Sequence, residues 1–418
     1  MGRRCDAATL LPAVFLLVSV CGAPARPAEP AAVPEAPKGY GWRGDGSGIF
    51  PKSAPPAEWN AETKKNILWS AKVGVNKFSS PIVVGDKVFV VAEPAELICL
   101  DAASGKVLWR KPNDFSELAT KTEEKKAKGS PGNVTPTPVS DGRYVYASFG
   151  CGIIGCYDLD GTRQWLVFLD FPPGTQYGRS ASPLLAGDKL LVSIHHLIAL
   201  EAKTGKVVWQ NEKVPERYGT PAAARIGALD VVLAPSGYAV RLKDGVTLGK
   251  VPQLVYATAL VKGNVAYFVG PTTTALELSA PTEDTLQTKI LWESDIEGTF
   301  YASPVCDSGL FFAACNEGSF YVLDAGDGKV LLTKELDIPS AAGRDNMPDA
   351  NMYPSLSLAG RHLFLSNDIG YTIVLEPVRE YREVRRNRLL EGSGGTPAFA
   401  GGRMFVRDGQ QLLCIGER

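Results

Sequence analysis

The sequence repeats itself, and this feature limits the possible fold more than any other. Each copy consists of a Ser, Thr or Tyr followed by Pro, an apolar run, a Gly- or Asp-containing turn and a second apolar run. Seven copies begin at Ser80-Pro81, Thr137-Pro138, Ser182-Pro183, Thr220-Pro221, Ser303-Pro304, Tyr353-Pro354 and Thr396-Pro397, and an eighth, without the proline, at Thr258-Ala259. A mean period of about 45 residues is typical of four-stranded blades and not of helical arrays.

Turn residues divide each copy into short strands. Pairs such as Gly85-Asp86, Asp141-Gly142 and Gly187-Asp188 separate two β-rich runs, and these residue types tolerate the positive φ of a hairpin. A second hairpin follows in residues 100–109 and returns in residues 200–209. Four strands per unit and eight units predict an all-β protein, an eight-bladed β-propeller with four-stranded antiparallel blades.

The two ends of the chain predict how the propeller closes. The eighth unit begins at Thr396 and leaves room for only three strands, whereas Ile67–Ser70 near the start has the pattern of an outer strand with its Trp. We expect this N-terminal strand to complete the last blade, so that no long sheet edge stays free. The propeller then spans residues 65–418, and residues 26–64 form an extended lead-in.

Residues 1–25 have the pattern of a secretory signal peptide. Arg3 and Arg4 precede an apolar run and the small-residue stretch Ala23-Pro24-Ala25. The mature protein is therefore expected to be exported, either periplasmic or extracellular. A lipid anchor at Cys21 is an alternative, although Val20 stands where lipidation sites usually have a small residue. No later stretch approaches the ~20 apolar residues of a membrane span.

Composition narrows the range of partners. The chain carries 44 Lys+Arg and 45 Asp+Glu, a net charge of -1, which gives no electrostatic footprint for nucleic acid. With 45% apolar and 21% charged residues, general disorder is excluded. We expect a monomer that binds a protein or a small ligand.

A second motif carries a family resemblance. The pattern Asp/Glu-Ala-x-Thr/Ser-Gly-x-x-x-Trp, as in residues 101–109, resembles the tryptophan-docking repeat of pyrroloquinoline-quinone-type (PQQ-like) propellers, and residues 41–48 look like the lead-in of such proteins. The superfamily includes quinoprotein dehydrogenases and a non-enzymatic lipoprotein that assists outer-membrane β-barrel assembly. Five Trp residues share one repeat position and are expected to pack blade against blade: Trp69, Trp109, Trp165, Trp209 and Trp292.

An aromatic residue recurs just before the innermost strands, at Phe78, Tyr177, Tyr218, Tyr256, Tyr301 and Tyr353. These side chains are expected at the mouth of the central channel, with Arg179 and Asn351 as the nearest polar groups. They either plug the funnel by packing on one another or form an aromatic site for a planar ligand or a peptide. The candidate ligand-binding residues are Tyr177, Arg179, Tyr218, Tyr301, Asn351 and Tyr353.

Cysteine and histidine give no metal site. Cys151 and Cys156 bracket a short tip and could form a disulfide in an exported protein, but Cys156 shares its repeat position with Cys99 and Cys414, which favours a buried thiol. His195 and His196 are predicted at a loop between the second and third strands of the third unit. Neighbouring side chains on a strand point in opposite directions, so a shared metal is not expected.

Two functions remain open. The first is an exported, non-catalytic binding or scaffolding propeller that engages its partner through the loop-rich face, with envelope protein assembly as one role and no cofactor. The alternative, implied by the resemblance, is a small quinoprotein oxidoreductase that uses PQQ and calcium, with a loop carboxylate as general base. Oxygen-bearing loop residues are present at Glu297, Asp345, Asp349 and Asn351, although no motif assigns them that role.

Overall fold

Short β-strands joined by tight turns make up nearly all the regular structure of the computed structural model, which describes residues 1–2, 40–75, 78–118, 135–172, 174–176, 178–342 and 347–417. The signal-peptide assignment, Cys21 and lead-in residues 26–39 lie outside the described residues. No helix in the described ranges is both long and apolar enough to cross a membrane. The one helical turn described is η1 (Phe115–Glu117).

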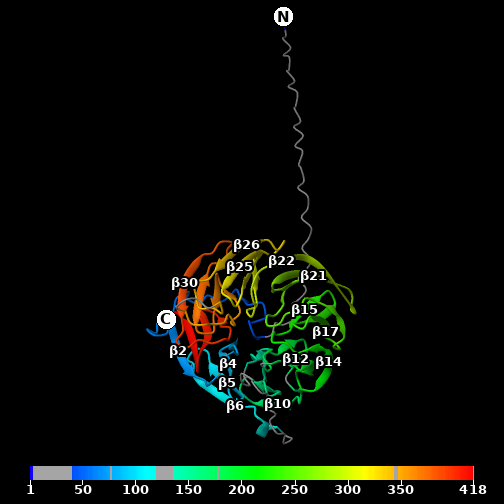
Figure 1. The fold of residues 1–418 in the computed structure, drawn as a ribbon, viewed down its shortest axis with the longest axis vertical. Coiled ribbons are helices and arrows are strands. Elements are labelled where there is room, and N and C mark those ends of the chain that lie inside the picture. Colours follow the sequence, from blue (N-terminus) through cyan, green and yellow to red (C-terminus); the bar gives the residue numbers. More distant parts are fainter. Residues whose placement is uncertain are drawn as a thin grey trace. The chain divides into compact units, whose positions relative to one another are not determined.

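Within residues 37–418, the described strands form eight sheets arranged around one axis (Figure 1). Blades 1 to 4 contain β3 (Ile82–Val84), β4 (Lys87–Ala92), β5 (Glu96–Asp101) and β6 (Val107–Pro112); β7 (Val139–Ser140), β8 (Tyr144–Ser148), β9 (Ile153–Asp158) and β10 (Arg163–Phe168); β11 (Leu184–Ala186), β12 (Lys189–Ile194), β13 (His196–Glu201) and β14 (Val207–Pro215); and β15 (Ala222–Ile226), β16 (Leu229–Ala234), β17 (Tyr238–Arg241) and β18 (Thr247–Lys250).

Blades 5 to 8 contain β19 (Leu260–Lys262), β20 (Val265–Phe268), β21 (Thr272–Thr282) and β22 (Thr285–Asp295); β23 (Val305–Asp307), β24 (Leu310–Ala314), β25 (Ser319–Asp324) and β26 (Val330–Glu335); β27 (Ser357–Ala359), β28 (His362–Ser366), β29 (Tyr371–Leu375) and β30 (Glu383–Arg388); and β31 (Ala398–Ala400), β32 (Arg403–Asp408), β33 (Gln411–Gly416) and β2 (Ile67–Lys72). The predicted eight-bladed, four-stranded propeller is confirmed. A further strand, β1 (Ile49–Phe50), joins blade 7 from inside.

The N-terminal strand completes the last blade, as the sequence predicts. β2 pairs antiparallel with β33, with Trp69 opposite Cys414 and Lys72 opposite Gln411. In Figure 1 the C-terminus accordingly lies beside the blue N-terminal segment. Both ends of the propeller are thus held in one sheet.

The apolar core is divided among the joints between blades. The buried hydrophobic residues form eight clusters in the described structure, and each joins two neighbouring blades. Phe89 of blade 1 and Tyr157 of blade 2, for example, share one cluster with Ile153. Because the middle strands are buried on both faces, they read as continuous apolar runs, as in β4.

Five tryptophans lie on these joints. Each indole Nε1 donates a hydrogen bond to a backbone carbonyl of the next blade at 2.9–3.1 Å: Trp69 to Ala102, Trp109 to Leu159, Trp165 to Ala202, Trp209 to Leu242 and Trp292 to Ala325. Each indole also covers a turn glycine with positive φ. At Gly245 an added Cβ would lie 2.5 Å from the Trp209 ring, so glycine is required there on two counts.

Every outermost strand contains a β-bulge at the same place. In each of the eight described blades, the pairing of the outermost strand with its neighbour contains one extra residue on the outermost strand. This extra residue directly precedes the position that Trp occupies in five blades. Leu108 and Leu291 are such extra residues, and both are exposed. A bulge bends and twists an edge strand, which makes it a poor template for another strand.

Candidate functional site

The innermost strands begin at a closed circle of hydrogen bonds. In each blade a Ser or Thr hydroxyl oxygen accepts from the backbone N–H of the corresponding residue in the preceding blade, at 2.9–3.1 Å. The eight residues, named here the hydroxyl collar, are Ser80, Thr137, Ser182, Thr220, Thr258, Ser303, Ser355 and Thr396. The last bond, from the Thr396 N–H to the Ser80 oxygen, closes the circle. The repeated Ser/Thr of the sequence therefore couples neighbouring blades.

The collar corrects the start of the seventh repeat. The sequence places it at Tyr353-Pro354, but the hydroxyl that accepts the Ser303 N–H is that of Ser355. Pro354 precedes Ser355, and Leu356 stands where six of the other copies have proline. The misplaced proline imitates the motif two residues early.

Five aromatic side chains sit just upstream of the collar and touch in a continuous series. Neighbouring ring centroids lie 5.4 Å apart for Tyr218 and Tyr256, 4.3 Å for Tyr256 and Tyr301, 5.0 Å for Tyr301 and Tyr353, and 5.5 Å for Tyr353 and Phe78. All five are half-buried. We call this series the aromatic crescent. It spans blades 4 to 7 and, across blade 8, reaches blade 1.

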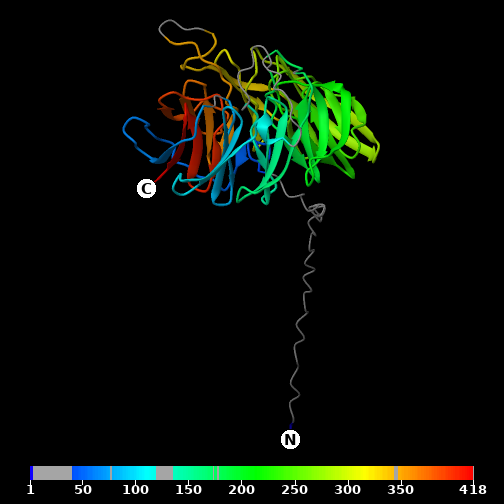
Figure 2. The same ribbon diagram turned by 90° about the horizontal axis from the view of Figure 1, so that it is seen from below.

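The crescent covers only part of the mouth. Each of its members lies two residues before its collar residue, and at this position blades 2, 3 and 8 have Thr135, Ser180 and Gly394. Tyr177, the sixth predicted aromatic, lies outside the described residues and five residues before Ser182. The face that carries the crescent also carries the described parts of the segment between β26 and β27, which rise from the propeller in Figure 2.

The phenol of Tyr301, at the centre of the crescent, is a neutral hydrogen-bonding group. Burial, with the adjacent Tyr256 and Tyr353, raises the pKa of Tyr301 to about 12. Tyr301 therefore keeps its proton at neutral pH and remains a donor. The surface of the crescent combines apolar ring area with phenol hydroxyls, a combination common in binding surfaces.

Arg179 lies beside the crescent but is buried. Its Nη1 donates to the carbonyl of Gly150 at 2.8 Å, and its Nη2 donates to the carbonyl of Phe171. Its exposed fraction is 6%, and desolvation lowers its pKa while Glu216 acts in the opposite direction. Glu216 is itself buried and accepts from the N–H groups of Gly174 and His195. The two charged groups hold the loops before β11 and β15.

Asn351 belongs to a polar network on the other side of the mouth. Its N–H donates to Asp368 Oδ1 at 2.8 Å, and its side-chain oxygen accepts from Asn316 Nδ2 at 3.2 Å. The same Asn316 accepts from the Met352 N–H. Asn351 therefore fixes the loop that presents Tyr353. Glu297 and Asp349 are exposed, and Asp345 lies outside the described residues.

The lead-in closes the channel from the opposite face. Tyr40 exchanges two 2.7 Å backbone hydrogen bonds with Ser140 of blade 2, and β1 pairs parallel with β27, with Ile49 opposite Leu358. Between these anchors the chain crosses the centre of the propeller, where Figure 1 shows it in blue. Sequence reasoning missed this strand because two residues have no periodicity.

Arg43 stands at the turning point of the lead-in. It is 3% exposed, and its Nη2 donates to the carbonyls of Ser47, Pro304 and Leu356. Burial lowers its pKa to about 9, and Asp45 acts in the opposite direction. Gly48 fits only without a side chain, because an added Cβ would lie 2.3 Å from Arg43 Nη2.

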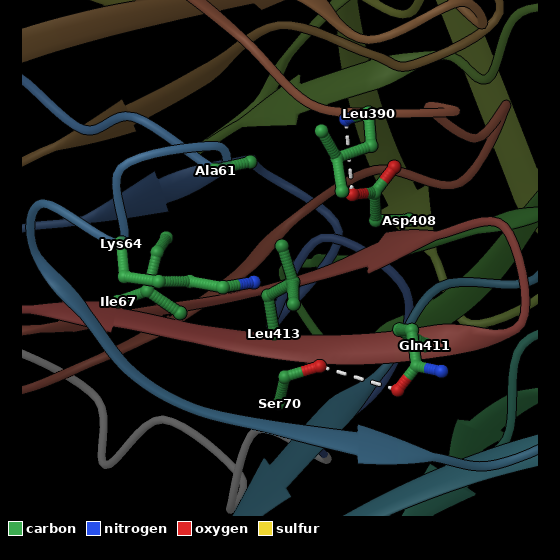
Figure 3. Close-up of a pocket in the computed structure, with 8 residues that line it drawn as sticks. All are labelled: Ala61, Lys64, Ile67, Ser70, Leu390, Asp408, Gln411 and Leu413. Carbon is green, nitrogen blue, oxygen red and sulfur yellow. Dashed lines mark hydrogen bonds between the residues drawn. The ribbon is translucent and has the colours of Figure 1, made fainter.

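A cavity of about 300 Å³ lies away from the mouth, on the outer side of blade 8. Figure 3 shows apolar residues such as Leu413 beside the amine of Lys64 and the carboxylate of Asp408. Asp408 accepts from the N–H groups of Leu390, Glu391 and Gly392. Its carboxylate is therefore already used to hold a loop.

The described cysteines are thiols, and one histidine is buried within the propeller. Cys99, Cys151, Cys156, Cys306, Cys315 and Cys414 are thiols, so the alternative of a bridge between Cys151 and Cys156 is not realised in this structure. Burial raises the pKa of Cys99, Cys156 and Cys414 to about 12. His196 is buried and its Nε2 lies 3.3 Å from Gln210 Oε1.

The described residues of the mouth do not form the donor set that PQQ and calcium need. Calcium takes six to eight oxygen ligands, usually with several carboxylates, yet no three His, Cys, Asp or Glu side chains converge within the described ranges. Asp368 and Glu216 already accept backbone N–H groups. The crescent rings touch one another, which leaves no gap for a planar quinone between them.

Comparisons with known proteins agree with this architecture. Residues 59–240 match a family model described as outer membrane protein assembly factor BamB. This chain is an eight-bladed β-propeller that resembles that family over residues 59–240. No curated protein matches its sequence. The residues that match the family model are less than half of the chain, so the match supports the type of repeat.

Solved structures similar to this propeller come from proteins of different kinds. BamB from Moraxella catarrhalis has 12% identity and a TM-score of 0.59, with 84% of this chain and 98% of that chain covered. A europium-containing methanol dehydrogenase has 13% identity and a TM-score of 0.58, with 89% of both chains covered. The computationally designed Ika8 protein has 12% identity and a TM-score of 0.57, covering 84% and 99%. At these identities the likeness shows the fold alone.

Proposed function

We propose that this protein is an exported, non-catalytic propeller that binds an extended polypeptide across the aromatic crescent, as a scaffold in envelope protein assembly. The observation that supports this proposal is the crescent itself, a continuous series of five half-buried rings. The match of residues 59–240 to an assembly-factor model points the same way.

The geometry of the crescent favours a segment that lies over the rings. Because Tyr256 and Tyr301 meet edge to face at 4.3 Å, nothing planar fits between them. An extended chain can instead place apolar side chains on the exposed ring area and backbone amides against the phenols. The gap at Thr135 and Ser180, on blades 2 and 3, leaves a side through which the segment would continue.

Fluorescence anisotropy with labelled twelve-residue peptides tests this function. We expect an apolar, aromatic-rich peptide to bind more tightly than an acidic or a basic peptide of equal length. Tyr256→Ala combined with Tyr301→Ala should weaken binding at least tenfold, because two central rings are removed. Tyr144→Ala, on blade 2 and away from the crescent, is the matched control. Equal affinities for the two variants would refute the proposal.

The alternative quinoprotein function has a direct test. The purified protein is mixed with PQQ and calcium, desalted, and examined by absorbance spectroscopy. We expect the protein to emerge colourless, since the described mouth lacks a fitting donor set. Stoichiometric retention of the quinone would overturn the binding proposal and direct the work to alcohol and sugar substrates with an artificial electron acceptor.

A further inference from the structure

The hydroxyl collar has hydrogen-bond donors that the described protein groups do not use. All eight oxygens of the hydroxyl collar accept a backbone N–H, which leaves each hydroxyl proton to be donated elsewhere. In the described structure none of these protons is used in a hydrogen bond to the protein. Seven of the eight residues are buried, and Thr220 is half-buried.

Arg43 adds a positive charge at the same level. Two of the carbonyls that hold its Nη2 belong to Pro304 and Leu356, the residues that directly follow the collar members Ser303 and Ser355. All three of its hydrogen bonds use Nη2, so Nε and Nη1 have no protein acceptor in the described part of the chain.

The charge of Arg43 is not balanced by contact. No carboxylate of a described residue lies within 4.0 Å of its guanidinium, and the nearest acidic influence comes from the exposed Asp45. The Trp42 ring, 5.4 Å from Arg43 Cζ, adds a weak attraction. Burying a charge without a partner is costly, and leaving buried donors unpaired costs free energy at each group.

We propose that the centre of the propeller binds a small monovalent anion between the hydroxyl collar and the guanidinium of Arg43. Water could accept the hydroxyl protons, but it cannot balance the charge. The site is small because the aromatic crescent lies on one side and the lead-in on the other. The anion stabilises the closed propeller and has no role in peptide binding, so this inference is independent of the proposed function.

Bromide locates the site directly. Crystals of the protein soaked in sodium bromide should show an anomalous peak on the propeller axis, within hydrogen-bond distance of Arg43 and of collar hydroxyls. In solution, replacing sodium gluconate by sodium chloride or bromide at constant ionic strength should raise the unfolding midpoint by a few degrees, with saturation. Sodium formate tests whether a carboxylate takes the same place.

Variants assign the effect to the guanidinium. Arg43→Gln should abolish the halide dependence, whereas Arg407→Gln, at another buried arginine with unpaired nitrogens, should retain it. If Arg43→Gln does not fold, Ser303→Ala keeps the charge, removes one hydroxyl and should weaken the halide dependence several-fold. An axis without a bromide peak, or equal halide responses of the wild-type and Arg43 or Ser303 variants, would overturn the proposal.

Discussion

The glycine beneath each docked tryptophan gives the sharpest stability prediction. Gly245 has a φ of +77°, and a Cβ added there would lie 2.5 Å from Trp209 Cε3 and 2.7 Å from Cδ2. Alanine at this position must therefore adopt a left-handed backbone and also displace a large ring. Trp209 is 8% exposed and donates to the Leu242 carbonyl at 3.0 Å, so displacement disturbs the joint between blades 3 and 4.

The magnitude follows from two separable contributions. The left-handed conformation costs alanine roughly 1–2 kcal/mol. Overpacking adds about 1–3 kcal/mol, and a strained Trp209 hydrogen bond about another 1 kcal/mol. We therefore expect Gly245→Ala to lower the free energy of unfolding by about 3–6 kcal/mol.

A matched control separates the two contributions. Gly263 has a φ of +61°, but an added Cβ there meets no atom within 4 Å. Gly263→Ala should lose only the roughly 1–2 kcal/mol of backbone strain. Urea unfolding followed by tryptophan fluorescence and circular dichroism measures both variants. Equal losses at the two glycines would refute the argument that the indole contact requires glycine.

Three further predictions concern the collar, the crescent and the thiols. Thr258→Val removes the acceptor of the Thr220 N–H and should cost about 1–3 kcal/mol in urea unfolding, whereas Thr258→Ser should cost much less; equal losses would contradict the collar. The folded pKa of Tyr301 is about 12 and the ordinary value is 10, so its contribution to stability is complete below pH 10 and is lost as the pH rises through 12. Tyr301→Phe should therefore flatten the fall in stability over this pH window. It should also remove one late step from the tyrosinate absorbance titration. A thiol reagent should modify half-buried Cys151 at least tenfold faster than the five buried thiols, whose pKa values are raised. These are Cys99, Cys156, Cys306, Cys315 and Cys414. Mass spectrometry identifies the modified residues, and fast modification of any of the five would refute their assignment as buried thiols.

The fold was predictable because its determinants are local and repeated. The turn chemistry around Gly85 and Gly187, the paired apolar runs and the period near 45 residues each recur often enough to outweigh lost copies. Even closure was readable, since Trp69 lies on a strand without partners nearby in the sequence. The predicted start of the seventh repeat was wrong for a local reason. Pro354 imitates the motif, but the hydroxyl that accepts the hydrogen bond belongs to Ser355.

The candidate site was only partly predictable. Tyr218, Tyr301 and Tyr353 come together because each occupies the same offset from a collar residue. Arg179 and Asn351 are near the mouth, yet their polar atoms bind backbone groups and other loops, an outcome that depends on loop paths the sequence does not encode locally. Arg43 was missed as an interior residue, since its partners Pro304 and Leu356 are remote in sequence.

The way in which the ends meet also governs how the chain can fold. The bond between Thr396 and Ser80 joins residues 316 positions apart, and that between Ser70 and Gln411 spans 341. Synthesis delivers the N-terminal strand first and its partner last, so blade 8, the collar and the contacts of Arg43 with blades 6 and 7 must all wait for late segments. Contacts this distant slow folding, and a chain cut short by even one terminal strand would leave blade 8 incomplete and β2 without its partner.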